Sequence, residues 1–508
     1  MNSGSNSFRN SDWLLLGLVV VMSCFTYFYN YTQPTSLYWD EVYHVTSAQK
    51  YLNNSYFMEL HPPVGKLLLA AGEKLIDAND DELNRIYKDT NHVKKRVEGF
   101  SLNGYRFFPA LLSWITAVVL FFIFLAITRT TILATFFSFL YIFDTALSVH
   151  LPGALLEGPM IFFCSLSLLI FLHIINIKKP NIKFKVLSFI LGITFALTFL
   201  TKITGLFLLL LFPILFIGLW PKWKVWIIGM IFAFFGFLIT FIGVWHVHIS
   251  LGTEVTNQGF YSASALYKEA LESDNPIPFS LYPTAIKDHL KYSIKYNDGV
   301  PKLDMCKVHE AGSPWFYWPL GARSITYAKK SYAEDKVGYL MFQVNPAVWW
   351  LSAFAVLIAF SLLTCSYLLG LKLKQRFLLN SFCILYAGYM FGISQIDRVM
   401  YLHHYLLPLI ISFILAALVL NEVKQIGKWK FDHDHKVFVA LCLSICIFAT
   451  YHFYKPLSTM RPLTKAQLEK RAIFPLWNLR CSGCKRNDPF FNPPAICKEN
   501  QNPYTNKK

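Results

Sequence analysis

The sequence predicts an all-α integral membrane protein, and three observations lead to this fold class. Of the 508 residues, 55% are apolar and only 15% are charged, whereas soluble domains are about 45–50% apolar and about 25% charged. Apolar runs of membrane-spanning length recur along the whole chain. Basic residues gather in the short segments between these runs, as they do in membrane proteins. Together these features exclude a disordered chain and a small disulfide-stapled scaffold.

We expect about eleven transmembrane helices, each close to the ~20 residues that a bilayer core requires. The fifth and sixth form one apolar stretch that is interrupted only at residues 201–204. We separate them because a single span of that length would far exceed the bilayer thickness. The expected spans lie near residues 13–30, 106–127, 131–150, 152–176, 185–201, 204–220, 225–248, 346–370, 377–396, 402–421 and 436–455.

Four short basic loops predict the orientation in the membrane. All four fall on one side if the helix count is correct, and the positive-inside rule makes that side cytoplasmic. The N-terminus is then inside, with the first span as a signal anchor, and the C-terminal tail (456–508) is outside. The tail is itself basic, but long segments translocate largely regardless of charge. The basic residues are Lys178, Lys179, Lys183 and Lys185; Lys222 and Lys224; Lys372, Lys374 and Arg376; and Lys424, Lys428, Lys430 and Lys436.

The same topology gives one membrane domain (1–455) and three long outer segments. These are a first loop (31–105), a second loop (249–345) and the tail. Long connections of this kind are usually functional. An amphipathic pattern in the first loop predicts surface helices from Glu41 to Leu52 and from Lys66 to Ile76. The net charge of +17 favours anionic lipid rather than nucleic acid as a partner.

Ionisable residues in or beside spans are expensive, and here they concentrate at the outer boundary of the membrane. A carboxylate there could take a proton from an incoming hydroxyl, while cations stabilise a leaving lipid phosphate. This chemistry predicts group transfer from a lipid-phosphate-linked donor. A transporter is the alternative, but an ion path should cross the membrane and the inner half has few ionisable groups. The outer residues are Asp40, Glu41, Arg106, Asp144, Glu157, Lys202, His246, His248, Asp397, Arg398, His403 and His404.

Several motifs in order resemble the protein O-mannosyltransferase family, which are integral-membrane glycosyltransferases of the GT-C class. The first pair is Tyr38-Trp39-Asp40-Glu41 followed by His61-Pro62-Pro63-Val64-Gly65-Lys66. The matches cover roughly residues 38–410. The further matches are Gly104-Tyr105-Arg106, Thr201-Lys202-Ile203-Thr204-Gly205-Leu206-Phe207, Ser313-Pro314-Trp315-Phe316-Tyr317-Trp318-Pro319-Leu320, Asn345-Pro346-Ala347-Val348-Trp349-Trp350 and Arg398-Val399-Met400-Tyr401-Leu402-His403-His404-Tyr405-Leu406-Leu407-Pro408.

Two departures from the family pattern bear on the expected type of member. The loop at 249–345 has no room for the large carbohydrate-binding-like insert of eukaryotic members, which indicates a bacterial-type chain. Near the start of the fourth span, Pro152 stands where the family has Arg, and Glu157 stands where it has Asp. The second departure bears on the identity of donor or acceptor more than on the fold.

The resemblance implies a role for each candidate residue. Asp40 is expected to act as the general base, and a single base working in line implies inversion at the sugar carbon. Glu41 is expected to position the acceptor chain. Donor phosphate binding is expected of Lys202, Arg398, Arg106, His403 and His404, and acceptor binding or structural support of His61, Lys66 and Glu157.

Simpler interpretations of these residues stay open. Long basic side chains such as Arg106 and Lys202 also snorkel at interfaces, and Arg398 could form an ion pair with the adjacent Asp397. The His61-Pro62-Pro63 element could serve only as a rigid turn. Of two adjacent histidines on a helix, such as His403 and His404, at most one is expected to face a site.

No cofactor or metal is expected, because the donor carries its own activated sugar and His246-x-His248 lacks a nearby third ligand. Four cysteines fall outside the spans, and a disulfide is the default chemistry there, with the pairing open. They are Cys306, Cys481, Cys484 and Cys497.

The function expected from the resemblance is transfer of mannose from a polyprenyl phosphate to Ser or Thr hydroxyls of exported proteins. The reaction would take place at the outer face of the cell (inner) membrane. The nearer alternative is a relative of the same fold that glycosylates a lipid or cell-envelope polymer, as aminoarabinose transferases do. The farther alternative is a transporter of a lipid-linked sugar. Whether the chain pairs with a second copy or another subunit is left open.

Overall fold

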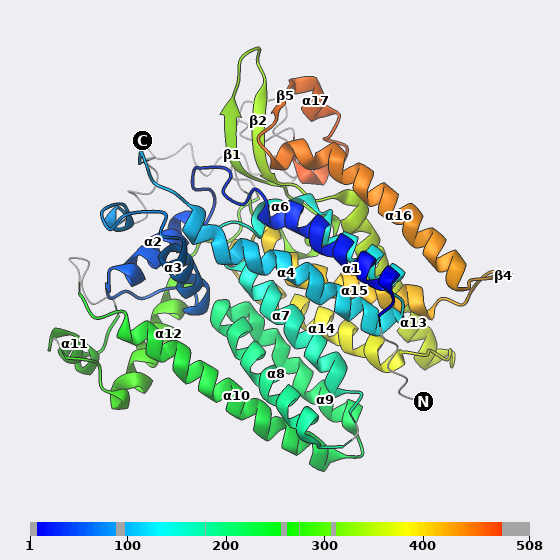
Figure 1. Cartoon of the computed structure of the whole chain (residues 1–508), viewed down its shortest axis with the longest axis horizontal. Coiled ribbons are helices and arrows are strands. Elements are labelled where there is room, and N and C mark those ends of the chain that lie inside the picture. The colour runs from blue at the N-terminus through cyan, green and yellow to red at the C-terminus, as the bar shows by residue number, and fades with distance from the viewer. Residues whose placement is uncertain are drawn as a thin grey trace.

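The computed structural model describes residues 8–87, 97–177, 179–255, 262–273, 275–305 and 311–479. Among these residues, nine helices are long and apolar enough to cross a membrane, which confirms a helical, multi-pass fold (Figure 1). They are α1 (Asn10–Ser23, extended by η1, Cys24–Phe28), α4 (Asn103–Thr128), α7 (Glu157–Ile174), α8 (Ile182–Thr201), α10 (Trp223–Ser250), α13 (Pro346–Leu368), α14 (Arg376–Ser394), α15 (Leu406–Glu422, preceded by η7, Leu402–Tyr405) and α16 (His433–Tyr454).

The expected count of eleven spans is not confirmed, because two of the expected segments form shorter helices. The third is divided into α5 (Thr131–Ile142) and α6 (Thr145–His150). Asp144 ends the first and caps the second, since its Oδ1 accepts a hydrogen bond from the backbone N–H of Leu147 at 2.8 Å. The sixth consists of the 3₁₀ segment η4 (Ile203–Leu210) and α9 (Leu211–Leu219).

The helical conformation is interrupted at Lys202, between α8 and η4. This residue has an extended backbone (φ −152°, ψ 135°), which ends the helix and turns the lysine side chain out of the apolar register. The break lies in the 201–204 interruption noted in the sequence. It gives Lys202 a position at the end of a membrane helix rather than within one.

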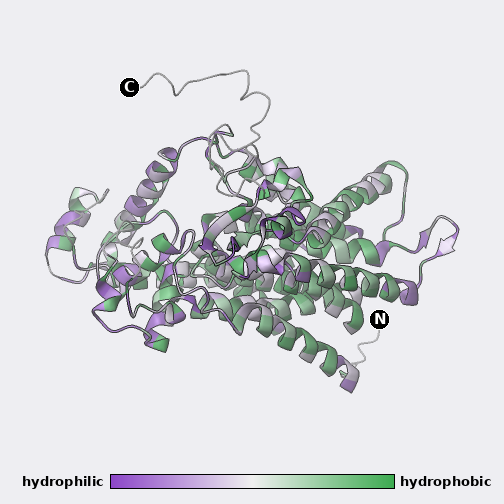
Figure 2. Cartoon of the chain, turned by 90° about the horizontal axis from the view of Figure 1, so that it is seen from above, coloured by the Kyte–Doolittle hydropathy of each residue, from purple (hydrophilic) through white to green (hydrophobic). Residues whose placement is uncertain are grey.

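Helix α15 lies at the centre of the bundle and is buried over its whole spanning length. It packs against α13 and α14, and α4 and α5 lie on its other side. Helices α1, α10 and α16 are the least buried, and their exposed side chains are large and apolar, as lipid-facing residues should be. Figure 2 shows this apolar middle with hydrophilic residues at the two ends of the bundle.

The two outer loops fold at one end of the bundle (Figure 1). The first forms α2 (Glu41–Leu52), α3 (Val64–Ile76) and the turn η2 (Leu83–Arg85), so the two helices expected there are present. The second forms α11 (Ala265–Glu272), η5 (Phe279–Leu281), α12 (Tyr282–Asp298), η6 (Trp315–Leu320) and a β-hairpin, and this hairpin departs from the all-α expectation.

The hairpin consists of β1 (Ile325–Ser331) and β2 (Val337–Phe342), which pair antiparallel with a bulge between Thr326 and Ala328. A third strand, β5 (Pro462–Leu463), pairs with β2. The remaining elements of this region are η8 (Lys455–Ser458), α17 (Lys465–Glu469) and η9 (Pro475–Trp477), and Trp477 is buried against Trp350. Residues 456–479, which we expected to begin a separate tail, are therefore packed onto the outer loops.

The opposite end of the bundle carries the basic loops and the start of α1 (Figure 1). The backbone oxygen of Ile127 accepts hydrogen bonds from Gln375 and Asn421, both at 3.2 Å, and this links the ends of α4, α14 and α15. A short hairpin of β3 (Gln425–Ile426) and β4 (Trp429–Lys430) projects from this end. The short basic loops thus lie at one end of the structure, and the long loops expected outside lie at the other, as the sequence predicted. The four cysteines that we expected outside the spans, Cys306, Cys481, Cys484 and Cys497, all lie outside the described residues.

Two glycines allow α8 and α10 to approach closely. A Cβ added at Gly192 would lie 1.9 Å from the backbone oxygen of Ala233, and one added at Gly236 would lie 2.1 Å from that of Phe189. Membrane helices lack a hydrophobic driving force between them, so small residues that permit backbone contact contribute much of their association.

We predict that Gly236→Leu destabilises the protein, because the side chain must separate α8 from α10. Overpacking of this kind typically costs about 1–3 kcal/mol. Thermal unfolding of the detergent-solubilised protein would measure the effect. Gly243→Leu on the same helix is the matched control, since a Cβ there meets nothing within 4 Å, and equal destabilisation by both would contradict the prediction.

Candidate functional site

Most of the polar residues singled out in the sequence converge beneath α2 and α3, where the outer loops cover the membrane helices. The contributing segments are the start of α2, the turn between α6 and α7, the break at Lys202 and the 3₁₀ segment η7. Aromatic side chains from β1 and from the residue before η7 lie beside Trp39, whose ring centroid is 5.3 Å from that of Tyr327 and 5.1 Å from that of Tyr401.

Asp40 lies at the N-terminus of α2 and is half-buried. Its backbone oxygen accepts hydrogen bonds from Tyr43 and His44 at the start of α2, but its carboxylate has no hydrogen bond or ion pair to another described residue. Burial raises the pKa of Asp40 to about 6, and the negative charge of Glu157 adds to this effect, while Lys202, His150 and Arg398 oppose it. A carboxylate with a pKa near the working pH is suited to accept a proton.

Trp39, the residue before Asp40, has a strained backbone and an unpaired donor. Its φ of +50° lies in the left-handed region that non-glycine residues rarely occupy. Its indole Nε1–H is buried and has no acceptor among the described residues. Strain and an unsatisfied donor beside a free carboxylate are features of a binding site rather than of a packed core.

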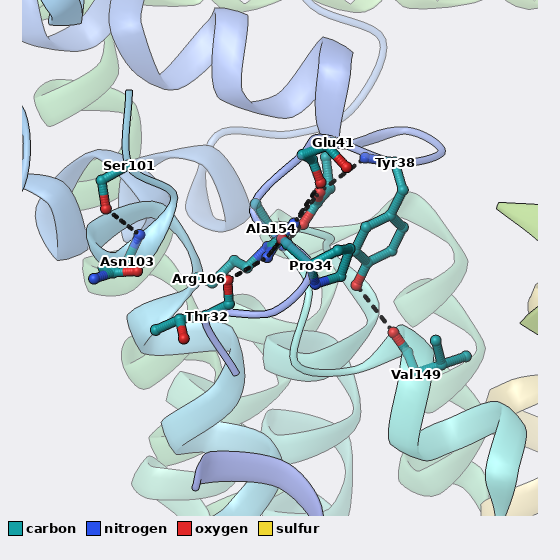
Figure 3. Close-up of polar contacts among 10 residues, drawn as sticks. Thr32, Pro34, Tyr38, Glu41, Ser101, Asn103, Arg106, Val149 and Ala154 are labelled. Atoms are coloured by element: carbon teal, nitrogen blue, oxygen red, sulfur yellow. Dashed lines mark hydrogen bonds and ion pairs between the residues drawn. The ribbon is translucent and has the colours of Figure 1, made fainter. Parts of the chain in front are cut away.

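Glu41 and Arg106 form a buried ion pair whose bonding capacity is fully used (Figure 3). The guanidinium donates to Oε1 of Glu41 through Nε at 2.7 Å and to Oε2 through Nη2 at 2.8 Å. Its other donors bind the backbone oxygens of Thr32, Pro34 and Ser36. Since all five N–H groups have acceptors, Arg106 offers none to a phosphate in this structure.

The Glu41 carboxylate also accepts two backbone hydrogen bonds, from Tyr38 at 3.0 Å and from Ala154 at 2.7 Å. It therefore holds together the first outer loop, the start of α4 and the turn before α7 (Figure 3). This bonding gives Glu41 a structural role. Both of its carboxylate oxygens already accept hydrogen bonds, so neither is free for the acceptor-positioning role expected from the sequence.

Lys202 and Glu157 form a second buried pair, with Nζ 2.5 Å from Oε1. The other oxygen of Glu157 lies 3.2 Å from Nε2 of His150, and Nδ1 of His150 is 2.5 Å from the hydroxyl of Tyr327. The network thus joins α7, α8, α6 and β1. The positive charge of Lys202 is largely compensated by Glu157.

His403 and His404 lie in different environments. His403 stacks on His150 at 5.2 Å and its Nε2 lies 3.9 Å from Oε1 of Glu157, so it faces the network. His404 instead bonds the backbone oxygen of Tyr401 at 3.0 Å and stacks on Trp318 at 6.1 Å.

Within the part of the chain that the structure describes, Arg398 is a cation of the site without a hydrogen bond or ion pair. Asp397 pairs with the exposed Lys302 and not with Arg398, so the structural ion pair considered for Arg398 does not form. Its Nε is buried without a partner among the described residues. Burial lowers the pKa of Arg398 and the nearby Asp40 opposes this shift, but a guanidinium stays charged.

His61 and Lys66 form a neighbouring cluster with His44 and Glu59. Lys66 is fully buried and donates to Glu59, which also accepts from Ser47 at 3.1 Å. Burial, together with the charge of Lys66, holds the pKa of both His44 and His61 well below the usual value, so both are neutral at pH 7. The Nδ1 atoms of these histidines are buried and unpaired among the described residues.

Several residues of the site had no role in the sequence analysis, among them Tyr327, His150, Glu59, Trp39 and Tyr401. Tyr327 lies on a strand that the hydropathy pattern did not indicate, so no signal could have found it. His150 lies two residues before Pro152, and its partner Tyr327 is 177 positions away. Glu59 lies two residues before His61, and its partners Lys66 and Ser47 are 7 and 12 positions away. The described residues contain no group of three or more metal-ligating side chains. His246 and His248 contact separate partners, Tyr282 at 2.7 Å and Tyr51 at 2.6 Å.

The structure resembles solved membrane glycosyltransferases. It matches the S. cerevisiae protein O-mannosyltransferase Pmt1–Pmt2 complex bound to the sugar donor with a TM-score of 0.74 and 14% identity, over 98% of this chain and 96% of that one. It matches ArnT from Cupriavidus metallidurans bound to undecaprenyl phosphate with a TM-score of 0.50 and 12% identity, over 89% and 77%. The fold is therefore that of the GT-C class of glycosyltransferases.

Two family models together cover most of the chain. One, described as dolichyl-phosphate-mannose-protein mannosyltransferase, matches residues 17–253. The other, described as the C-terminal four TMM region of protein-O-mannosyltransferase, matches residues 289–477. The chain belongs to the protein O-mannosyltransferase family.

Curated relatives match over shorter regions. Protein O-mannosyl-transferase 2 of Drosophila melanogaster is 25% identical over 42% of this chain. The polyprenol-phosphate-mannose–protein mannosyltransferase of Mycobacterium tuberculosis is 29% identical over 30% of this chain. Each match spans 27% of the relative's own length.

We predict that Glu41→Gln strongly destabilises the protein, because it leaves the buried Arg106 charge without its counterion. Breaking one partner of a buried pair costs about 3–5 kcal/mol. Thermal unfolding in detergent would measure the loss. Asp397→Asn is the matched control, since it breaks the exposed pair with Lys302 and should change stability by less than about 1 kcal/mol. Similar effects of the two substitutions would contradict the structural role of Glu41.

Proposed function

We propose that this protein transfers mannose from a polyprenyl-phosphate-linked donor to Ser or Thr hydroxyls of exported proteins, with inversion at the sugar. The observation that carries the proposal is the half-buried carboxylate of Asp40, which has no partner among the described residues and lies in the electrostatic field of Arg398, whose Nε also has no partner among them. Membership of the mannosyltransferase family supports the choice of sugar and acceptor.

In the proposed reaction, the acceptor oxygen attacks the anomeric carbon while its proton passes to a carboxylate oxygen of Asp40. The bond between that carbon and the phosphate oxygen breaks, and its electron pair leaves with the lipid phosphate. Arg398 is the principal cation for this phosphate, because a guanidinium can make bidentate contacts to oxyanions. Lys202 contributes from its pair with Glu157. Preorganised charge of this kind stabilises the negative charge that develops on the leaving group.

The remaining candidates take supporting roles in this proposal. Trp39 offers its indole N–H to the sugar, whose ring would lie against Tyr327 and Tyr401. His403 joins the Lys202–Glu157 network, and His61 and Lys66 support the floor of the site. Arg106 and Glu41 hold the loop that carries Asp40, and His404 holds the backbone of η7. No step requires a metal ion.

We also propose the orientation predicted by the basic loops. The end of the bundle that carries them, with the start of α1, would face the cytoplasm of the cell (inner) membrane, and the candidate site would face outward. An exported acceptor chain could then reach Asp40 between the two outer loops.

We predict that Asp40→Asn abolishes turnover but leaves donor binding intact, because the amide cannot accept the proton yet keeps the shape of the side chain. Loss of a general base lowers the rate by about 10²–10⁴-fold. The test follows the gain of one hexose on a Ser/Thr-rich peptide, with polyprenyl-phosphate mannose as donor. Retained turnover in the variant would exclude Asp40 as the base.

The same assay separates the alternatives. A relative that glycosylates lipid would bind the donor without adding hexose to the peptide. A transporter would give no covalent product with any acceptor and would move substrate equally well in the Asp40→Asn variant.

We predict that kcat/KM rises with pH through about 6 and is level above it. The base must be deprotonated to act, and the pKa of Asp40 is raised by burial to about 6. A pH series of the peptide assay measures this. The bound donor adds a negative charge beside Asp40, so the midpoint for kcat should lie at higher pH than that for kcat/KM. An activity that is level from pH 4 to 8 would contradict the assignment.

A further inference from the structure

A cavity lies at the end of the bundle opposite to the candidate site. Its volume is about 1090 Å³, and it opens between the start of α1, the turn from α4 to α5, the end of α7 and the start of α16. None of the residues of the proposed reaction lines it. The elements that line it lie at the end of the bundle that carries the basic loops (Figure 1), where the proposed orientation puts the head groups of the other leaflet.

The walls of this cavity divide into an apolar and a basic part. Side chains from α4 and α7 form the apolar part, including Phe122, Leu125 and Leu169. The basic part carries Arg9 and Arg129, with His173 and His433 beside them. A cavity with such walls matches an amphiphile with an acyl chain and an anionic head.

The single acid among the described lining residues, Asp12, is already engaged. Its Oδ1 accepts from Thr131 at 2.5 Å, and its Oδ2 accepts from the backbone N–H of Arg9 at 2.9 Å. Arg9 also approaches this carboxylate at 3.5 Å. Asp12 therefore offsets at most one of the two arginines, and the cavity keeps an excess of positive charge.

Two further groups in the cavity wall are available to a ligand. Arg129 ends α4 in the left-handed conformation (φ +64°), which turns it out of the helix, and its side chain is exposed without an ion pair to another described residue. The hydroxyl oxygen of Thr130 is buried and has no hydrogen-bond partner among the described residues. A phosphate oxygen placed between them would satisfy both.

We propose that this cavity binds the head group of an anionic glycerophospholipid from the leaflet opposite to the candidate site. Arg129 and Arg9 would bind the phosphate, Thr130 would donate to it, and an acyl chain would lie along Leu125 and Leu169. Basic clefts between transmembrane helices bind anionic lipid heads in this way. The proposal is independent of the transfer reaction, because it concerns other residues and another leaflet.

The test measures lipid-dependent thermal stabilisation of the full-length protein in detergent. The probes are phosphatidylglycerol, zwitterionic phosphatidylcholine with the same acyl chains, and inorganic phosphate. We expect phosphatidylglycerol to stabilise the protein most, and Arg129→Gln to weaken its apparent affinity roughly five-fold. Lys428→Gln, which removes the same charge from the exposed β3–β4 turn at the same end, should leave the affinity unchanged.

A second variant tests the cavity itself and does not depend on Arg129. Ala126→Phe fills the apolar wall without changing charge, and it should also weaken phosphatidylglycerol binding; it decides the test if Arg129→Gln does not fold. Equal weakening by Lys428→Gln would mean diffuse attraction and would overturn the proposal. Equal stabilisation by phosphatidylcholine would overturn the role of charge, and equal stabilisation by inorganic phosphate would overturn the role of lipid.

Discussion

The arrangement of the end of the bundle that carries the candidate site depends on the ion pair between Glu41 and Arg106. One carboxylate and one guanidinium, both without solvent exposure, bind each other twice and take up five backbone groups from the first loop and the turn before α7. The pair fixes the start of α2 on α4, and Asp40 is the residue immediately before Glu41. A buried pair of this kind is costly to desolvate, but with every donor satisfied it holds the adjacent carboxylate at a defined position.

The balance of charge explains how the two acids of the Asp-Glu motif differ. Arg106 neutralises Glu41 and Lys202 neutralises Glu157, so both pairs add structure with little net charge. Asp40 and Arg398 remain, one of each sign and neither paired to a described residue. A site that must bind a phosphate and accept a proton needs these two free charges. The proposed reaction therefore uses the groups that the fold leaves unpaired rather than all the charged groups in the motifs.

The two ends of the bundle also differ in how far their charged groups are buried and paired. At the end with the candidate site, most charges are buried, paired and covered by α2, α3 and the β-hairpin. At the opposite end, basic side chains are exposed around an open cavity with apolar walls. The apolar middle contains α15, which is buried on all sides and makes the bundle one packed unit. Both proposals rest on this difference: the first places a lipid phosphate among the groups at the candidate site, and the second places a lipid head group in the open cavity.

The amino-acid sequence by itself determined the membrane class, the helical fold, the two helices of the first loop and the break at Lys202, because hydropathy and helical periodicity are local properties. Its ordered motifs also indicated the family. Only the tertiary structure decided which charged residues are free, since that depends on partners far apart in the chain: Arg106 lies 65 positions from Glu41, and Lys202 lies 45 from Glu157. It also divided two expected spans into shorter helices and placed Tyr327 of an unexpected strand against His150. Pairing of distant side chains and short strands leaves no periodic signal in one sequence.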